Sequence, residues 1–314
     1  NPIVPYGTRI NKLGFVVYWR THIETTEVLL MIVDIDHLRT WIGKTEITND
    51  IVTASQLAGY SAILDRDDAY PKVGDPLPPS AHWLYFLPQA RQSLIGPDGH
   101  PERGAFLPPI DLPRRMWAGS RLEFKRDLKV GEEIHRVSTI KDVTHKRGKN
   151  GDLVFCVVRH EISNADGVAI IDEHDIVYRE EHDANVSPPP SKPAPDGAVW
   201  NRQIDPDPVL LFRYSALTFN GHRIHYDRSY VTETEGYPGL IVHGPLIATL
   251  LMDLARREHP SKRMSGFSFR ALSPVFDTAK FQVNGLPSDE GSSAELWVSK
   301  HDGSLAMKAD ATFE

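Results

Sequence analysis

The chain has 314 residues, about twice the ~150 that are typical of one domain, so it is long enough for two hydrophobic cores. It is 40% hydrophobic and 25% charged, as is ordinary for a globular protein. Its formal net charge is -7, from 35 Lys and Arg against 42 Asp and Glu. Such a chain lacks the basic character with which sequence-independent nucleic-acid binders attract phosphate, and we expect no nucleic-acid partner.

Two local features bear on the compartment. The single cysteine, Cys156, lies in the apolar run 154–158, which predicts a buried structural thiol and excludes a disulfide within the chain. The apolar run 28–33 is much shorter than the ~20 residues that cross a bilayer, so we expect no membrane partner. These observations favour the cytoplasm, with the mitochondrial matrix as the alternative for a eukaryotic source.

In chain order, residues 1–30 show no coherent periodicity, and we expect a leader or tag-like segment there. A first orderly helix is expected from Asp34. The proline-rich stretch 186–199 fixes backbone angles and removes hydrogen-bond donors, which is typical of a linker. The sequence therefore predicts an N-terminal domain at 31–185 and a C-terminal domain at 200–314.

The N-terminal domain reads mainly as antiparallel strands. Turn residues that tolerate positive φ separate successive apolar runs, which predicts a meander. The expected strands are 121–128, 133–145, 153–163 and 168–180, with turns at 149–152 and 164–167.

The C-terminal domain reads as one helix followed by strands. Residues 245–257 carry five large aliphatic side chains on one face, with Asp253, Arg256 and Arg257 opposite. Four alternating segments follow, and Asp302-Gly303 marks a hairpin between the last two. The expected strands are 266–272, 278–284, 293–300 and 304–314. One buried helix with antiparallel strands belongs to the α+β class.

Chemically active side chains gather in two places. Residues 214–227 contain Asn220, His222 and His225, and His243-Gly244-Pro245 opens the apolar helix. Pro245 suits the first turn of a helix, and Gly244 lets a ligand approach the free amides at its positive end. Those amides are suited to hold an oxyanion, although Gly-Pro is also a common helix start.

These segments resemble the signature of the (R)-specific enoyl-CoA hydratases and MaoC-like dehydratases. The resemblance rests on the string 220–225 followed by Ile-Val-His-Gly at 241–244. Asn220 stands where that family has an aspartate, and a carboxamide cannot act as a base. The longer string 212–227 is similar to a double hot-dog branch with mesaconyl-CoA and itaconyl-CoA hydratases and mitochondrial 3-hydroxyacyl-thioester dehydratases, in which Asn-Gly-His-Arg-Ile-His-Tyr-Asp is the usual wording. Residues 116–131 resemble the N-terminal hot dog of that branch, so the resemblance covers about 36–314.

The resemblance implies a double hot-dog fold, two curled antiparallel sheets that each wrap a helix, and a hydro-lyase acting on a short 2-enoyl-CoA. His225 is then the acid/base, Asn220 positions the water and His222 is a second proton carrier. The Gly244 N–H binds the thioester oxygen, and His243 shapes that turn. No metal or other cofactor is implied, since the CoA thioester is the substrate. A zinc site built from His222, His225, Asp227 and His243 stays an alternative without a recognised spacing.

The arginines near the motif suggest the acyl group. Arg213, Arg223 and Arg228 offer forks of donors that match a free carboxylate, which favours mesaconyl or itaconyl thioesters. Their alternative role is ion pairing with carboxylates such as Asp207, Glu233 or Asp227. The expected substrate-binding residues are Arg213, Arg223, Tyr226 and His243. A basic cluster after the central helix is expected either to meet CoA phosphates or to be a solvated helix end; it consists of Arg256, Arg257, Lys262 and Arg263.

Other functions remain open on the sequence alone. They are a 3-hydroxyacyl-CoA or acyl-carrier-protein dehydratase of fatty-acid synthesis, a non-catalytic thioester-binding protein suggested by Asn220, and a hot-dog thioesterase. The N-terminal half lacks the motif, so it is expected to supply walls of the acyl tunnel and no second site. The protein is expected to be a monomer of two hot dogs or a homodimer.

Overall fold

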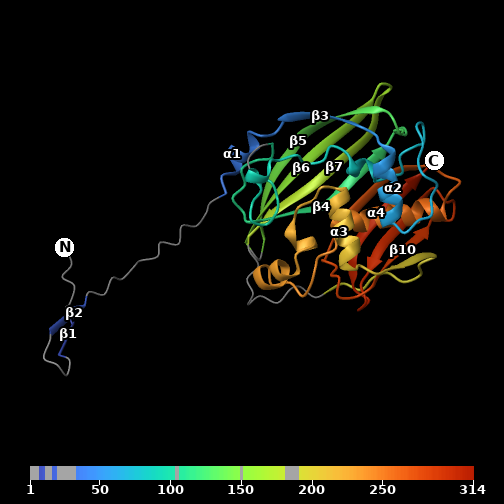
Figure 1. The fold of residues 1–314 in the computed structure, drawn as a ribbon. Coiled ribbons are helices and arrows are strands. Elements are labelled where there is room, and N and C mark those ends of the chain that lie inside the picture. Colours follow the sequence, from blue (N-terminus) through green and yellow to red (C-terminus); the bar gives the residue numbers. More distant parts are fainter. Residues whose placement is uncertain (1–6, 11–15, 20–32, 103–105, 149–150, 181–190) are drawn as a thin grey trace. The chain divides into compact units, whose positions relative to one another are not determined.

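The computed structural model describes residues 7–10, 16–19, 33–102, 106–148, 151–180 and 191–314 (Figure 1). Residues 1–33 and 34–314 form two separate units. In the first unit, β1 (Gly7–Ile10) pairs with β2 (Val16–Trp19) as an antiparallel hairpin. The rest of the expected leader, and residues 186–190 of the expected linker, lie outside the described residues.

The second unit is built on a ten-stranded antiparallel sheet in the order β3-β5-β6-β7-β4-β9-β12-β11-β10-β8 (Figure 1). Its first half comprises β3 (Thr45–Ile51), β4 (Arg114–Phe124), β5 (Glu133–Gly148), β6 (Gly151–Asn164) and β7 (Gly167–Arg179). Its second half comprises β8 (Trp200–Ile204), β9 (Met264–Ala271), β10 (Phe281–Pro287), β11 (Ser293–Ser299) and β12 (Leu305–Phe313). The predicted meander and the predicted C-terminal strands are confirmed, whereas the edge strands β3 and β8 were not predicted.

The two halves of the sheet join through β4 and β9, which pair from Gly119 opposite Arg270 to Glu123 opposite Gly266. The two expected sheets are therefore one continuous sheet. A Cβ at Gly119 would lie 2.4 Å from the carbonyl oxygen of Phe269, so a glycine is required where these strands meet.

Four α-helices accompany the sheet in the described part of this unit. The helices are α1 (Ile35–Arg39), α2 (Ala54–Ile63), α3 (Pro208–Leu217) and α4 (Gly244–Glu258). Short turns are η1 (Ala81–Leu84), η2 (Gln92–Leu94), η3 (Arg223–His225) and the π-helical η4 (Tyr230–Thr234). Helix α4 is buried from Leu246 to Ala255 and contacts the strands of the second half, while α2 buries Leu57, Tyr60 and Ile63 in the same core. This is the predicted α+β arrangement, although α2 and α3 were not predicted.

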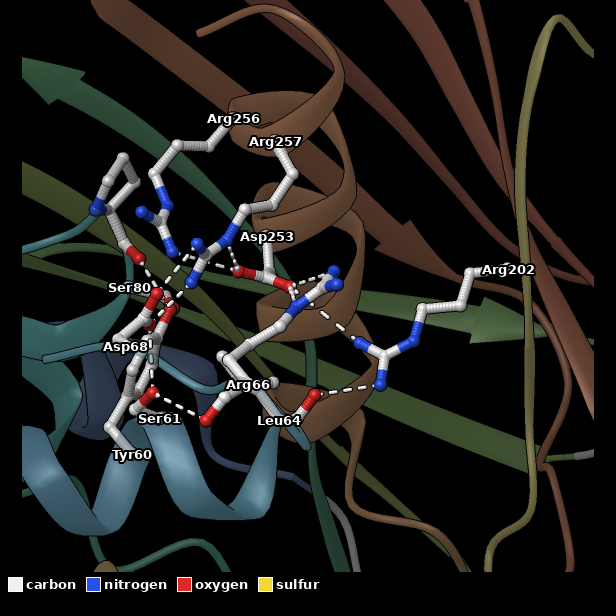
Figure 2. A network of polar contacts seen from close by, with 11 residues as sticks. Tyr60, Ser61, Leu64, Arg66, Asp68, Ser80, Arg202, Asp253, Arg256 and Arg257 are labelled. Carbon is white, nitrogen blue, oxygen red and sulfur yellow. Dashed lines mark hydrogen bonds and ion pairs between the residues drawn. The ribbon is translucent and has the colours of Figure 1, made fainter.

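The polar side of α4 is packed against other elements of the fold. Asp253 is 1% exposed and lies at the centre of a cluster of arginines (Figure 2). Arg66, just after α2, donates from Nε and Nη2 to Asp253 Oδ2 at 2.9 and 2.7 Å, and Arg202 of β8 lies 3.7 Å from the same oxygen. The carboxylate therefore ties α4 to the segment after α2 and to an edge strand.

The basic cluster expected at the end of α4 is likewise paired internally. Arg256 and Arg257 both donate to Asp253, and Arg257 also pairs with Asp68. Arg263 pairs with Asp127 and Glu314, and Lys262 donates to the carbonyl of Glu290. Neither a solvated helix end nor a free phosphate-binding cluster describes these side chains.

Two other sequence predictions were tested by the fold. Cys156 is fully buried on β6, as expected, and burial raises the pKa of its thiol to about 12. Within the described residues, every helix is too short or too polar to cross a membrane.

Candidate active site

The site begins at the C-terminal end of α3. Asp207 caps this helix by accepting hydrogen bonds from the amides of Val209 and Leu210. After the helix, Phe219 adopts a positive φ of 50°, and the N–H of Asn220 returns to the carbonyl of Ser215. The Asn220 Oδ1 accepts the amide of His222 at 3.0 Å, an Asx turn that fixes the side chain at the head of the following loop.

His225 is held in a defined orientation on η3. Its Nδ1–H donates to the carbonyl of Ile241 at 2.7 Å, which places the proton on Nδ1 and leaves the Nε2 lone pair free. The side chain is buried, and this burial lowers its pKa to about 4 despite the hydrogen bond that it donates to the carbonyl of Ile241. At neutral pH His225 is therefore an uncharged imidazole that can accept a proton on Nε2.

His225 belongs to a row of four imidazoles, which we define as His100, His222, His225 and His243. Successive ring centroids lie 3.9, 5.4 and 3.7 Å apart. His243 stacks on His225 at an interplanar angle of 20° and its Nε2 bonds Ser215 Oγ at 2.8 Å. Burial lowers the pKa of His222 to about 2 and that of His243 well below its usual value. His222, His225 and His243 are thus uncharged at neutral pH, and stacking on His243 holds the plane of the His225 ring.

One end of this row was not anticipated from the sequence. His100 Nδ1 bonds Asp98 Oδ2 at 3.0 Å, and the N–H of Arg223 donates to the carbonyl of Asp98. Gly99 packs so tightly on Gly221 that a Cβ there would lie 1.9 Å from the Gly221 oxygen. The N-terminal half therefore supports the loop that carries His225, and only the paired glycines hint at this contact in the sequence.

Gly244 is the first residue of α4, so its N–H has no acceptor within the helix. Its N-cap residue, His243, makes no side-chain capping bond, and Pro245 follows within the first turn. A Cβ built on Gly244 would meet no atom within 4 Å. Open space therefore adjoins a free amide at the positive end of a buried helix, as an oxyanion site requires.

A cavity of about 760 Å³ lies beside these groups. From the C-terminal half its walls include Ser215, Asn220, Arg223, Tyr226 and Pro245. Four residues of the expected site lie just behind this wall: His222, His225, His243 and Gly244. His222, His225 and Gly244 are each next in the chain to a wall residue, and His243 is hydrogen-bonded to the wall residue Ser215. Arg213 is exposed on α3 and is not a wall residue either.

The three arginines of the motif divide into two kinds. Arg223 pairs with Asp227 at 2.8 Å and also donates to the carbonyl of Pro97, and Arg228 pairs with Asp277. Ion pairing, the alternative role, is therefore what the structure shows for both. Arg213 makes no ion pair with any described residue. Tyr226 donates to the carbonyl of Gly221 and lines the cavity.

Metal ligation is possible at one place among the described residues. Ligand atoms of Asp98, His100 and His222 all lie within 4.8 Å of one another. This set differs from the zinc alternative of the sequence and shares only His222 with it. The Asp98–His100 hydrogen bond already uses two of the three ligands.

The N-terminal half supplies more of the cavity wall than expected. Its wall residues include aromatic side chains of η1 and β4 and polar side chains of β5, β6 and β7: His82, Trp83, Trp117, Arg136, His160, Asp172 and His174. Sequence reasoning treated the three strands as apolar runs and missed these residues. Their signal was the presence of charged or imidazole side chains at inward positions of alternating strands.

Comparison with known proteins identifies the family to which the chain belongs. Residues 80–277 match the family model described as hydroxyacyl-thioester dehydratase type 2. The chain is 46% identical over 269 residues to the mesaconyl-C(4)-CoA hydratase of Chloroflexus aurantiacus, covering 86% of this chain and 95% of that protein. The chain belongs to the hydroxyacyl-thioester dehydratase family. This family is of the MaoC-like type that the motif indicated, and its named members are hydratases or dehydratases, so the protein is a hydro-lyase.

One further relative and one solved structure extend the comparison. The mitochondrial hydroxyacyl-thioester dehydratase type 2 of Schizosaccharomyces pombe is 30% identical over 250 residues, covering 71% of this chain and 81% of that protein. A conserved Mycobacterium tuberculosis protein with a double hot-dog fold superposes with a TM-score of 0.54 at 12% identity, covering 87% of this chain and 96% of the other. The double hot-dog fold expected from the resemblance is confirmed, with the sheets of its two halves joined into one.

Proposed function

We propose that this protein adds water to, or removes it from, a short 2-enoyl-CoA whose acyl group is a branched dicarboxylic acid of the mesaconyl type. The observation that carries the proposal is the position of His225, whose Nδ1 is engaged by the carbonyl of Ile241 and whose ring stacks on that of His243. His243 directly precedes Gly244, the residue with open space at the start of α4. A base for water and a donor for an enolate oxygen are the groups that hydration of an enoyl thioester needs.

The reaction follows from these two groups. His225 Nε2 takes a proton from water while the water oxygen bonds to Cβ, and the double-bond electrons move onto the thioester oxygen. The Gly244 N–H stabilises that oxyanion. The enolate then reforms the thioester carbonyl and takes a proton at Cα from the His225 imidazolium, so one O–H bond and one C=C π bond are exchanged for a C–O and a C–H bond.

Other residues of the motif assist in this proposal. The Nδ2 of Asn220 is left free by the Asx turn and would orient the attacking water. His222 carries no extra proton at neutral pH because burial lowers its pKa to about 2, so it is proposed as a neutral neighbour of His225. No metal or other cofactor has a role in this chemistry. The cytoplasm, or the mitochondrial matrix in a eukaryote, stays a prediction.

The acyl group is proposed from the relatives. The 46% identical relative is named as a hydratase of mesaconyl-C(4)-CoA, which supports a dicarboxylic substrate. The family model and the 30% identical relative are named for hydroxyacyl-thioester dehydratases, which supports dehydration of a 3-hydroxyacyl thioester as the second candidate.

The test is a comparison of three thioesters with the purified wild-type protein. Loss or gain of enoyl absorbance is followed with mesaconyl-C(4)-CoA, crotonyl-CoA and a longer 3-hydroxyacyl-CoA. The proposal expects the highest kcat/KM with the mesaconyl ester. A preference for the long 3-hydroxyacyl ester would support the second candidate, and no change with any of the three would refute both.

A further inference from the structure

A polar cluster of buried and half-buried side chains lies on the inward face of the first half of the sheet, on residues outside the catalytic motif. The cluster comprises Arg136, Ser138, His160, Asp172 and His174. Its neighbours on the same face of the sheet are the buried aliphatic residues Ile140, Val158, Ile162 and Ile170. Strand register sets Ser138 opposite His160 and His160 opposite Asp172, while Arg136 is two residues from Ser138. Burying polar groups among aliphatic side chains is costly unless they are fully paired or serve a ligand.

Asp172 organises one side of this cluster. Its Oδ2 accepts from Trp83 Nε1 and His174 Nε2, each at 2.8 Å, and lies 3.3 Å from His82 Nε2. Burial raises the pKa of this carboxyl, but the charges and hydrogen bonds of His174 and His82 outweigh it and hold the pKa well below its usual value. The carboxylate is therefore ionised, and its charge is engaged by three N–H groups.

Arg136 on the other side has no such partner. Its guanidinium lies 4.9 Å above the ring of Phe86 and forms neither an ion pair nor a hydrogen bond with any described residue. The Nε atom is buried without an acceptor. Burial lowers the pKa of Arg136, yet a guanidinium remains charged in proteins. The carboxylates of Glu46, Asp172 and Asp50 act on this charge only from beyond direct contact. A half-buried cation that lines a cavity and makes no direct ion pair with a described residue is suited to an anionic ligand.

Two imidazoles complete the surroundings of this cation. His160 Nδ1 bonds Ser138 Oγ at 2.8 Å, and its ring meets that of His174 edge-on at 4.5 Å. His174 uses Nε2 on Asp172 and stacks on Trp117 at 4.0 Å. Each ring has a second nitrogen without a partner among the described residues, and both rings line the cavity with Arg136. The arrangement offers a fork of N–H donors with further polar atoms beside it, which fits a planar carboxylate.

We infer that Arg136, with His160 and His174, binds the free carboxylate of the acyl group in this cavity. The inference rests on the proposed function and deepens it, because it assigns selection of a dicarboxylic substrate to the N-terminal half. The motif arginines suggested by the sequence are not needed for this role, since Arg223 and Arg228 are already paired with aspartates.

A binding comparison with the wild-type protein tests this without any variant. Calorimetry measures the Kd of succinyl-CoA, a saturated dicarboxylic thioester, and of butyryl-CoA, which has the same carbon count and no carboxylate. We expect succinyl-CoA to bind about 10- to 100-fold more tightly, as one charge-assisted interaction provides. Equal affinities would overturn the inference.

Variants then assign the preference to Arg136. Arg136→Met is expected to abolish the difference between the two thioesters and to lower kcat/KM for mesaconyl-C(4)-CoA about 10- to 100-fold, with little change for crotonyl-CoA. Arg136→Lys should restore part of the preference. The control Arg147→Met removes an exposed arginine of the same strand and should leave kcat/KM unchanged for both substrates. An equal loss for both substrates in Arg136→Met would overturn the inference.

The two proposals fail separately in these experiments. If no enoyl thioester is turned over but succinyl-CoA is still preferred through Arg136, hydration fails and the carboxylate site stands. If hydration proceeds but neither binding nor kcat/KM depends on the carboxylate or on Arg136, the site fails and hydration stands.

Discussion

On acidification, the free energy of unfolding of this protein is expected to fall at a pH well above that at which carboxylates titrate. Four imidazoles have pKa values lowered in the folded state, chiefly by their partial or full burial: His160, His222, His225 and His243. In the unfolded chain each returns to about 6.5, so the unfolded state binds more protons and stability falls as the pH drops through that value. Asp98 and Asp172 also have lowered pKa values, but their loss begins only near the ordinary carboxyl value of 3.8.

The size of this effect follows from the linkage relation. Between about pH 7.5 and about pH 5.5, each such histidine removes about 1.4 kcal/mol from the free energy of unfolding, and four remove about 5.5 kcal/mol. Urea unfolding at the two pH values measures it. His222→Gln should reduce the loss by about 1.4 kcal/mol, whereas His301→Gln, at an exposed turn, should leave it unchanged. A wild-type stability that is flat over this range would refute the assignment of neutral buried imidazoles.

Three further outcomes follow from the structure. Asp253→Asn leaves four arginines around a neutral amide and should lower the free energy of unfolding by about 3–5 kcal/mol in urea titrations, whereas the exposed Asp36→Asn should change it little; a small effect at Asp253 would contradict the network of Figure 2. Gly244→Val fills the open space beside the free amide and should lower kcat about 100-fold with the melting temperature retained, and unchanged kcat would remove Gly244 from the site. A thiol reagent should label Cys156 only after unfolding, since burial raises the pKa of its thiol to about 12; rapid labelling of the native protein would contradict its burial.

The sequence was sufficient for elements whose burial follows their own periodicity. The alternation of β12 and the aliphatic positions of α4 predict the elements because each pattern is local. The association of residues 220–225 with Gly244 was predicted from the family resemblance, whose signature contains both segments. Helix α2 was missed because its apolar residues are spread around the helix, so that no single face marks it.

Groups that depend on contacts between distant segments could not be predicted. In the sequence, Asp253 looks like any charged residue on the polar side of a helix. Its partners Arg66 and Arg202 come from distant segments of the chain, so its burial could not be predicted locally. Arg136, His160 and Asp172 come together through the register of three strands. Alternation along each strand marks them singly as polar residues at inward positions, but nothing local shows that the three meet.

Substitution of His225 tests the central claim most directly. His225→Ala removes the Nε2 that is proposed to accept the proton from water, and such acid–base groups contribute about 10²- to 10⁴-fold to rates. Turnover of mesaconyl-C(4)-CoA should fall by that factor, while calorimetry shows succinyl-CoA binding close to that of the wild type. A variant that still hydrates the ester within a few-fold of the wild-type rate would contradict the account.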